Sequence, residues 1–456
     1  MKRVPLFVAM LATTVLVTVM LGSCSKEDKT FTERSVSASM LPPPPLPPMT
    51  LSGVLGTGHT NPDVIHLTNS FVWHLSGLVY VDDQDILIID PGTTIIGDVS
   101  TGPSVPGGGL VITPGAKIMA EGTASNPIIF TSDAVMPVSG DWCGVIIIGK
   151  ASSNHSSPVT VEGLVNTGFP NVTYGGSSGT NDADNSGILK YVRIEYAGYE
   201  LSVDNEINGL TLAGVGSGTT INFVEVFKAA DDAFQFLGGT VNASHLLAVD
   251  ALDDMFDTEY GYRGTVSYGL GLADVTRADK STSNGIECDN NAIGMPTSIL
   301  TNPVFNFITL IGLPNQSLAS ITNGLPSGTG KYGRAAHLRR NSQFSISNSI
   351  AMGYNYGFSL DQQSGTTSGT FIRNYVHAFI IPFLQEMNGT VYTAIPTPVG
   401  NFAYLSVNPN ANILLANPFS RSSINNFMPL AISPARTAGA FPTGNTTWAN
   451  GWSRIQ

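Results

Sequence analysis

The sequence predicts an all-β protein, a single-stranded right-handed parallel β-helix, which is a solenoid with a C-terminal capping segment. Short apolar runs, such as the run from Val145 to Ile148, stand between Gly, Asn and Asp residues, as strands do between turns. Almost no stretch has the periodicity of an amphipathic helix. Motifs also return at intervals of about 22 residues, which is typical of stacked coils.

Three motifs carry this repeat. ADDAF at 230–234 returns as LDDMF at 252–256, IIDPG at 88–92 returns as VITPG at 111–115, and Gly-Thr pairs begin at 218, 239 and 264. Leucine-rich repeats share the period, but the chain lacks their fixed frame of leucine and asparagine. In the run 187–196, strict alternation predicts that Leu189 and Tyr191 share one face, opposite Val192 and Ile194.

The chain is expected to have three parts. Residues 1–23 are a signal peptide, because Lys2 and Arg3 precede a short uncharged apolar run. Residues 24–56 are a tether with the polyproline run MLPPPPLPP, a semi-rigid spacer. Residues 57–456 are the β-helix, capped near 430–456. There Phe441, Trp448 and Trp452 should cover the last coil, because an open end exposes core and strand edges.

Cys24 ends the apolar run in LGSC at 21–24, which resembles the bacterial lipobox. The resemblance implies cleavage before Cys24 and lipid attachment to its thiol, with a retained membrane span or plain secretion as the alternatives. SKED at 25–28 resembles the surface-export signal of Bacteroidetes lipoproteins, with a solvated tether as the alternative. Together these features predict a lipid-anchored outer-membrane protein that is exposed at the cell surface.

The variant Cys24→Ala should therefore leave the precursor unprocessed at this site and without label from a radioactive fatty acid, because the thiol is the group that accepts the lipid. Replacing Lys26, Glu27 and Asp28 with alanine should retain the protein inside the outer membrane, which protease accessibility on intact cells measures. Equal fatty-acid labelling of wild type and Cys24→Ala would contradict lipidation.

The composition limits the class of protein and its partners. Hydrophobic residues make up 42% of the chain and charged residues 12%, which is too apolar for a disordered protein. The excess of 33 acidic over 21 basic residues gives a net charge of −12, which argues against nucleic acid and anionic membrane surfaces as partners. Besides Cys24, the chain has only Cys143 and Cys288, and the sequence leaves open a disulfide or two buried thiols.

Several blocks extend over most of the chain from about residue 75. They are DWCGVIIIGK at 141–150, SGILKYVRIEYAG at 186–198, NEINGLTL at 205–212, the two Asp-Asp-x-Phe coils, NGIECDN at 284–290, and GAF followed by WANGW at 439–452. These blocks resemble a Bacteroidetes secreted and lipoprotein group of the pectin-lyase-like superfamily of right-handed parallel β-helices. Cys143 and Cys288 depart from the pattern, which has small non-thiol residues there. The resemblance implies a fold and an envelope location far more than an activity.

The superfamily includes polygalacturonases and calcium-dependent pectate lyases. The hydrolase pattern requires Asn-Thr-Asp, Asp-Asp, Gly-His-Gly and Arg-Ile-Lys in order, and only Asp-Asp is present. Hydrolysis of that type is therefore not expected. A calcium-dependent polysaccharide lyase stays an alternative, because acids on adjacent coils can supply the oxygen ligands of calcium.

Five acidic residues are the predicted calcium ligands: Asp231, Asp232, Asp253, Asp254 and Asp257. One coil spacing brings the two Asp-Asp pairs to about 4.8 Å, a distance at which unpaired carboxylates repel one another. A cation relieves this repulsion. The alternative is structural, a ladder of Asp and Asn side chains at the coil turns that accept hydrogen bonds from backbone N–H groups.

Four further residues are candidate ligand contacts. Lys228 and Arg263 flank the acidic coils in the sequence and are expected to bind a uronate carboxylate, to compensate the acids, or, in the lyase alternative, to serve as a base. Tyr260 and Tyr262 are expected to stack on sugar rings, with packing in the core or at an edge as the alternative. No residue is assigned a catalytic role.

The sequence therefore predicts a surface-exposed outer-membrane lipoprotein whose β-helix binds glycans or a neighbouring envelope surface, with calcium as the one candidate cofactor. An enzyme that acts on acidic polysaccharide, such as a calcium-dependent lyase, is the first alternative. A purely structural envelope protein is the second.

Overall fold

The computed structural model describes residues 46–56, 62–102, 105–176, 180–202, 205–295, 297–363, 365–387, 389 and 391–455. The predicted signal peptide, Cys24 and the expected tether up to residue 45 lie outside the described residues, and Leu46–Gln456 forms a single unit. Within the described ranges, no helix is long and apolar enough to span a bilayer.

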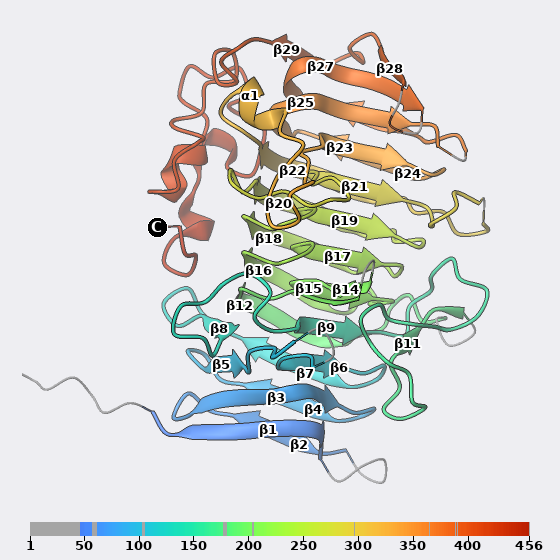
Figure 1. Cartoon of the computed structure of the whole chain (residues 1–456), viewed down its shortest axis with the longest axis vertical. Coiled ribbons are helices and arrows are strands. Elements are labelled where there is room, and N and C mark those ends of the chain that lie inside the picture. The colour runs from blue at the N-terminus through green and yellow to red at the C-terminus, as the bar shows by residue number, and fades with distance from the viewer. Residues whose placement is uncertain are drawn as a thin grey trace, which may run out of the picture. The chain divides into compact units, whose positions relative to one another are not determined.

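The chain winds as a parallel β-helix, in which the strands of each coil pair with strands of the next (Figure 1). Hydrogen bonds join 25 strands into one continuous sheet, and the pairs within it are parallel except for that of β27 and β28. Each coil presents three faces. This architecture confirms the predicted fold class.

The first face consists of β2 (Val64–Leu67), β4 (Ile86–Ile89), β7 (Lys117–Glu121), the first halves of β12 (Gly187–Glu195), β16 (Thr220–Phe227), β18 (Asn242–Val249), β20 (Thr265–Leu272) and β22 (Val304–Ile311), then β24 (Gln343–Ser347) and β26 (Ser368–Ile372). The second face consists of the first parts of β1 (Pro48–Leu55) and β3 (Val72–Val81), β5 (Thr94–Gly97), β8 (Ile128–Ser132), the second halves of β12, β16, β18, β20 and β22, the first parts of β25 (Ile350–Asp361) and β27 (Tyr375–Met387), and β29 (Phe402–Leu405).

The third face carries most of the ionisable side chains discussed below. It consists of the last parts of β1 and β3, β6 (Gly109–Ile112), β9 (Gly144–Ile148), β15 (Leu210–Ala213), β17 (Phe234–Leu237), β19 (Phe256–Glu259), β21 (Ile286–Asp289), β23 (Arg334–Arg339), the last parts of β25 and β27, and β28 (Val391–Ala394). Outside the faces lie β10 (Val159–Thr160), β11 (Thr173–Tyr174), β13 (Tyr199–Ser202), β14 (Asn205–Ile207), α1 (Gln316–Ala319), η2 (Ile424–Phe427), η3 (Pro442–Gly444) and η4 (Thr447–Ala449).

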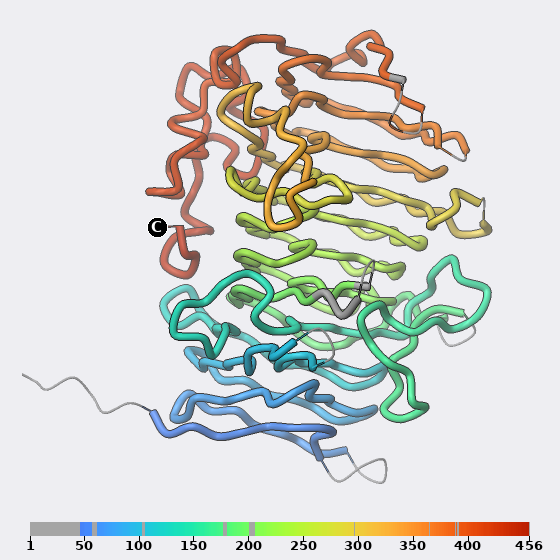
Figure 2. The backbone as a smooth tube through the Cα atoms, viewed as in Figure 1, coloured from blue at the N-terminus to red at the C-terminus, as the bar shows by residue number. Residues whose placement is uncertain are grey.

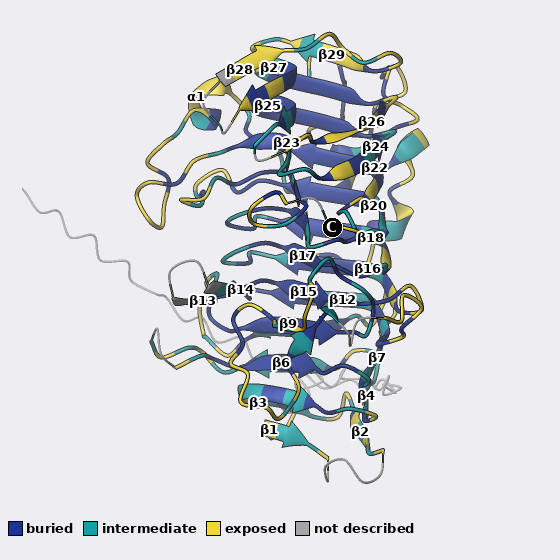
Figure 3. Ribbon diagram, turned by 90° about the vertical axis from the view of Figure 1, so that its right-hand side faces the viewer, coloured by how far each residue is buried: buried dark blue, intermediate teal, exposed yellow. Residues whose placement is uncertain are grey.

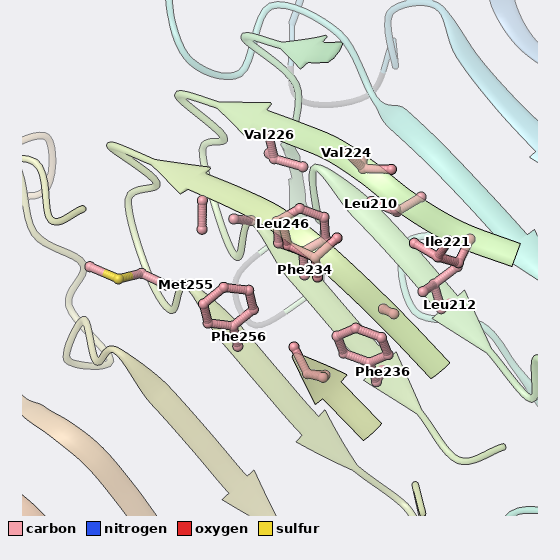
Figure 4. Packing of buried hydrophobic residues seen from close by; sticks show 14 of the residues in the cluster. Leu210, Leu212, Ile221, Val224, Val226, Phe234, Phe236, Leu246, Met255 and Phe256 are labelled. Carbon is pink, nitrogen blue, oxygen red and sulfur yellow. The ribbon is translucent and has the colours of Figure 1, made fainter. Parts of the chain in front are cut away.

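The core fills the space between the faces with one apolar side chain above another (Figure 4). Phe234 stacks on Phe256 at 5.6 Å between ring centroids, and both rings are fully buried. Burial follows the strands of all three faces, whereas exposure concentrates in the loops and at the two ends (Figure 3). Stacked identical or similar side chains therefore give each coil an apolar partner on both sides.

A residue with positive φ makes the corner between the first and second faces in successive coils. These residues are Tyr191, Phe223, His245, Tyr268 and Phe307, with φ between 50° and 58°. Such a conformation is unfavourable for bulky side chains. Their rings compensate by stacking outside the core at 4.4 to 5.1 Å.

This corner overturns the alternation expected for β12. Because the strand bends at Tyr191, Leu189 before the bend and Val192 and Ile194 after it are all buried in the core. The IIDPG and VITPG motifs do not occupy equivalent positions in successive coils. IIDPG begins at the end of β4 on the first face, whereas VITPG begins at the end of β6 on the third face. The Asp-Asp-x-Phe coils do stack, since Phe234 pairs with Phe256.

The solenoid begins earlier than residue 57. β1 starts at Pro48 and pairs in parallel with β3, so the end of the expected tether already forms part of a coil. The polyproline run ends at this strand, where proline is tolerated because the first residue of an edge strand needs no ladder N–H.

The C-terminal segment lies along the flank of the solenoid and not over its last coil (Figures 1 and 2). Trp452 packs edge-on against Tyr191 at 5.9 Å, and Phe441 stacks on Trp448, which lies 5.0 Å from His245. The expected position of these aromatic residues at the last coil is therefore wrong. The corner rings are the apolar surface that attracts them.

Both remaining cysteines are free and buried. Cys143 directly precedes β9 and Cys288 lies in β21, so the two cysteines belong to different coils. Burial raises the pKa of each thiol to about 12. They are therefore unreactive core residues.

Candidate acidic site on the third face

The acid cluster, which we define as Asp231, Asp232, Asp253, Asp254 and Asp257, lies where the chain enters the third face. The first pair precedes β17, the second pair precedes β19 one coil later, and Asp257 lies in β19 itself. Coil stacking brings one oxygen each of Asp231, Asp232 and Asp253 within 4.8 Å of one another. Asp254, Asp257 and Glu287 form a second such group. The predicted convergence of these acids is confirmed.

Part of this cluster belongs to a side-chain ladder. Asn208 Oδ1 accepts the N–H of Asp232 at 3.0 Å, Asp232 Oδ1 accepts that of Asp254 at 3.0 Å, and Asp254 Oδ1 accepts that of Asn284 at 2.5 Å. Asn284 Oδ1 continues the ladder to the N–H of Arg334 at 2.9 Å. The structural alternative therefore holds for one oxygen of Asp232 and one of Asp254.

Asp257 has no such role. Asp257 is 5% exposed, and its Oδ1 atom has no hydrogen-bond donor within the described part of the chain. Asp253 Oδ1 is equally unpaired among the described residues, whereas its Oδ2 accepts the Ser281 hydroxyl at 2.5 Å. An unpaired buried carboxylate oxygen is costly, so these two atoms indicate a missing cation or proton.

The acid cluster lines a cavity of about 200 Å³. The full lining is Glu162, Glu206, Asp231, Asp232, Asp253, Asp254, Asp257, Asp279, Lys280, Ser281 and Glu287. Nine of these eleven residues are acidic, and Lys280 is the single basic residue among them. The cavity therefore has a strongly negative potential.

Burial and mutual repulsion raise the pKa values of the cluster. Burial, followed by the charge of Asp279, raises the pKa of Asp253 to about 8. Burial and neighbouring carboxylates also raise the pKa values of Asp231, Asp232, Asp254 and Asp257 well above the usual range. The raised pKa values mean that these acids bind protons more readily than exposed carboxylates do, and a divalent ion would compete with those protons.

Glu287 marks the boundary of the acidic region. Its carboxylate pairs with the Arg339 guanidinium and with His337 Nδ1, the latter at 3.2 Å. Although burial opposes the charge, Arg339 and His337 hold the pKa of Glu287 at about 2. Glu287 is therefore held charged by its two partners, and the five members of the acid cluster are the candidate cation ligands.

A larger cavity of about 450 Å³ follows along the same side and shares Ser281 with the acidic one. Its lining includes Lys331, Arg334, Arg339, His337 and two stacked tyrosines, Tyr356 and Tyr392, whose ring centroids are 4.5 Å apart. Basic and aromatic groups thus adjoin the acidic cavity.

Comparison with protein-family models matches residues 58–453 to the pectate-lyase-like β-helix domain. The chain belongs to this family. No curated protein and no solved structure matches it. Family membership makes the pectate-lyase-like domain compatible with carbohydrate binding or processing.

None of the four predicted ligand contacts of this pectate-lyase-like domain lines the acidic cavity. Arg263 pairs with Asp182 at 2.9 Å, outside the acidic cavity. Lys228 Nζ lies 5.5 Å from the Phe227 ring centroid and does not line that cavity. Tyr262 is fully buried and donates its hydroxyl to Val241 O at 2.8 Å, so it is a core residue.

These corrections share a cause. Lys228 follows β16, at the corner before the third face, whereas Arg263 follows β19, at the corner after that face, so the two residues lie at separate corners. Tyr260 is half-buried at the far end of β19 and stacks on His155 at 4.5 Å. It is accessible in part, but an aromatic partner already covers one face of its ring.

Sequence reasoning missed four acids of the pectate-lyase-like domain's cavity. Glu162 and Asp279 come from loops and Glu206 comes from β14, all outside the regular coils, where no period indicates them. Glu287 pairs in register with Asp257. Because a long loop separates β20 from β21, the repeat of about 22 residues does not indicate this pairing. Its place in the block NGIECDN, after an Asp-bearing coil, was the available signal.

Proposed function

We propose that this pectate-lyase-like domain binds acidic polysaccharide through calcium held in the acid cluster, and that a lipid on Cys24 displays it at the surface of the outer membrane. The observation that carries the proposal is the unpaired Oδ1 of the buried Asp257, a residue that lines a cavity together with eight other acidic residues. The side-chain ladder accounts for the burial of Asp232 and Asp254, because each accepts a backbone N–H. It does not account for the burial of Asp257.

Calcium fits the cavity better than other common ions. It takes six to eight oxygen ligands in flexible geometry, and the acid cluster offers carboxylates without histidine or thiolate. Lys280, whose Nζ lies 3.8 Å from Glu206, is the single basic group of the lining and cannot neutralise nine acids. A divalent ion supplies that charge.

Polysaccharide fits the surroundings of the ion. The acidic cavity adjoins the 450 Å³ cavity at Ser281 and a third one of about 340 Å³ at Glu206, Asp231 and Asp279, so an extended ligand can contact several coils. A negatively charged polymer would be repelled by the bare acids and attracted once calcium is bound. Calcium bridging thus selects uronate-rich chains.

Binding is favoured over cleavage by the state of the basic residues. A lyase needs a base that can take a proton from the sugar. The guanidinium of Arg339 is bound by Glu287 and Asp289, and that of Arg334 by Glu386. These contacts neutralise the two guanidinium groups of the neighbouring cavity and support a binding role.

Calcium should raise the melting temperature of the wild-type domain, because a ligand at 100 times its dissociation constant stabilises the folded state by about 2.7 kcal/mol. Asp257→Asn should remove this rise, since the amide keeps the shape but not the charge. Asp133→Asn, which changes an exposed acid far from the cavity, is the matched control and should respond like wild type. Differential scanning fluorimetry with calcium and with chelator measures the effect.

The same variants test the ligand. Wild type should retain polygalacturonate or alginate with calcium and release it with chelator, whereas Asp257→Asn should not bind. A melting curve indifferent to calcium contradicts the metal site. Calcium binding without any retained glycan favours a structural role, and the appearance of unsaturated uronides would replace the binding function by a lyase.

A further inference from the structure

A second group of metal-ligating side chains lies on the third face, outside the acid cluster. His337 lies in β23, Asp361 ends β25 and Glu386 lies in β27, so three successive coils each contribute one residue. One ligand atom from each lies within 4.8 Å of the others, and all three side chains are buried. Stacking of outward-facing positions brings the three together.

The distances around His337 Nε2 resemble those of a metal coordination shell. Nε2 lies 3.3 Å from Asp361 Oδ2 and 3.2 Å from Glu386 Oε1. Both separations, like the 3.2 Å between His337 Nδ1 and Glu287 Oε1, are longer than the about 2.7–2.9 Å of a charge-assisted hydrogen bond. Metal bonds of about 2.1 Å separate neighbouring ligand atoms by about 3.0 Å in octahedral and 3.4 Å in tetrahedral geometry. A single N–H also cannot be directed well at two acceptors.

The surroundings orient these atoms as a coordination shell requires. His337 Nδ1 lies 3.2 Å from Glu287 Oε1, and a carboxylate partner on this nitrogen leaves the Nε2 lone pair for a metal. Arg334 donates to both oxygens of Glu386, at 2.9 and 2.6 Å, and Ser359 donates to Oε1 at 2.7 Å. The ligands are therefore held before any ion arrives.

The charges of the neighbourhood leave room for a cation. The carboxylates that face His337 and its neighbours are Glu287, Asp289, Asp361 and Glu386, and the guanidinium groups are those of Arg334, Arg339 and Arg340. These four carboxylates and three guanidinium groups leave one negative charge to be balanced at His337, either by a proton on the ring or by a bound ion. His337 and Asp361 also line the 450 Å³ cavity, which gives an ion a path to them.

We propose that His337, Asp361 and Glu386 bind a divalent ion of the zinc or manganese type, at a site separate from the calcium site. One imidazole nitrogen and two carboxylate oxygens suit these ions, whereas calcium prefers an all-oxygen shell. The site does not depend on the proposed calcium binding, because it shares no ligand with the acid cluster.

The test loads the purified full-length protein with Zn²⁺ in excess calcium, removes unbound ions by dialysis and measures zinc by mass spectrometry. We expect one zinc ion per chain, with an affinity that falls by more than about 100-fold in His337→Gln and Asp361→Asn, since changes beyond the direct ligands already cost 10- to 100-fold. His74→Gln is the control, because His74 also lies near two acids, at 3.8 and 4.0 Å, but on another face.

X-ray absorption on zinc-loaded wild type provides a measurement that no folding defect of a variant can obscure. One nitrogen and at least two oxygen ligands at about 2.0–2.1 Å are expected. An all-oxygen shell would overturn the proposal, as would a wild-type protein that retains no zinc after dialysis. Zinc that survives His337→Gln and Asp361→Asn in folded protein, or that disappears in His74→Gln, would overturn it as well.

Discussion

Trp452→Ala should lower the free energy of unfolding by about 3–5 kcal/mol, the range for a buried aromatic side chain. Trp452 is fully buried between the C-terminal segment and the corner rings of Tyr191 and Phe223. Its indole N–H donates to Trp448 O at 2.7 Å, so the substitution removes packing and a hydrogen bond together. Chemical denaturation with tryptophan fluorescence and circular dichroism measures the loss.

Truncation before Gly439 should have a larger effect and cause aggregation or a large fall in melting temperature. The truncation removes Arg454, whose N–H donates to Glu225 at 2.9 Å and whose guanidinium donates to Glu195 at 2.6 Å. Glu225 is fully buried, and burial raises its pKa to about 7. Loss of this partner leaves a buried carboxylate beside an uncovered apolar flank.

Ile432→Ala is the matched control, because Ile432 is largely exposed although it lies in the same C-terminal region. It should leave the stability unchanged to within about 0.5 kcal/mol. A truncated protein that stays monomeric and as stable as wild type would show that the flank contacts carry no stability.

In the presence of chelator, the domain should lose stability as the pH rises from 5 to 9. An unfolded Asp has a pKa of about 3.9, whereas burial and neighbouring charges raise that of Asp253 to about 8. Between these values the folded state binds more protons than the unfolded state, so stability falls by about 1.4 kcal/mol per pH unit for each such group. The stability that each such acid contributes is fully present below its pKa in the unfolded chain. That contribution is lost as the pH rises toward the pKa of the acid in the folded protein.

Calcium should oppose this loss, and its stabilising effect should be largest at the alkaline end, where it competes with the fewest protons. Asp253→Asn should flatten the pH profile in chelator, since the amide does not titrate. Melting curves across this pH range, with and without calcium, measure both effects. A flat wild-type profile in chelator would mean that the acids are already compensated in the apo protein.

The fold was predictable because the solenoid repeats its chemistry at each coil. The two Asp-Asp-x-Phe coils stack as expected, and their phenylalanines lie one above the other. The corner at Tyr191 was not predictable, because a positive φ within a strand leaves no mark in the pattern of apolar residues. The flank position of Trp452 depends on that corner and escaped prediction for the same reason.

The site was predictable only where the repeat continues. Asp231 and Asp253 could be placed together from their offset, but the acids that come from loops could not. The group of His337, Asp361 and Glu386 was also missed, because its coils differ in length and its members share no motif. Side-chain contacts across coils of unequal length require coordinates.

The C-terminal segment also gives the solenoid an order of assembly. Neighbouring coils pair over short stretches of chain, so each can form soon after it is synthesised or exported. The contact between Arg454 and Glu195 spans 259 residues and therefore closes last, after the coils it crosses exist. Once closed, it must detach before those coils can unravel one by one, so we expect it to act mainly by slowing unfolding, as a latch does.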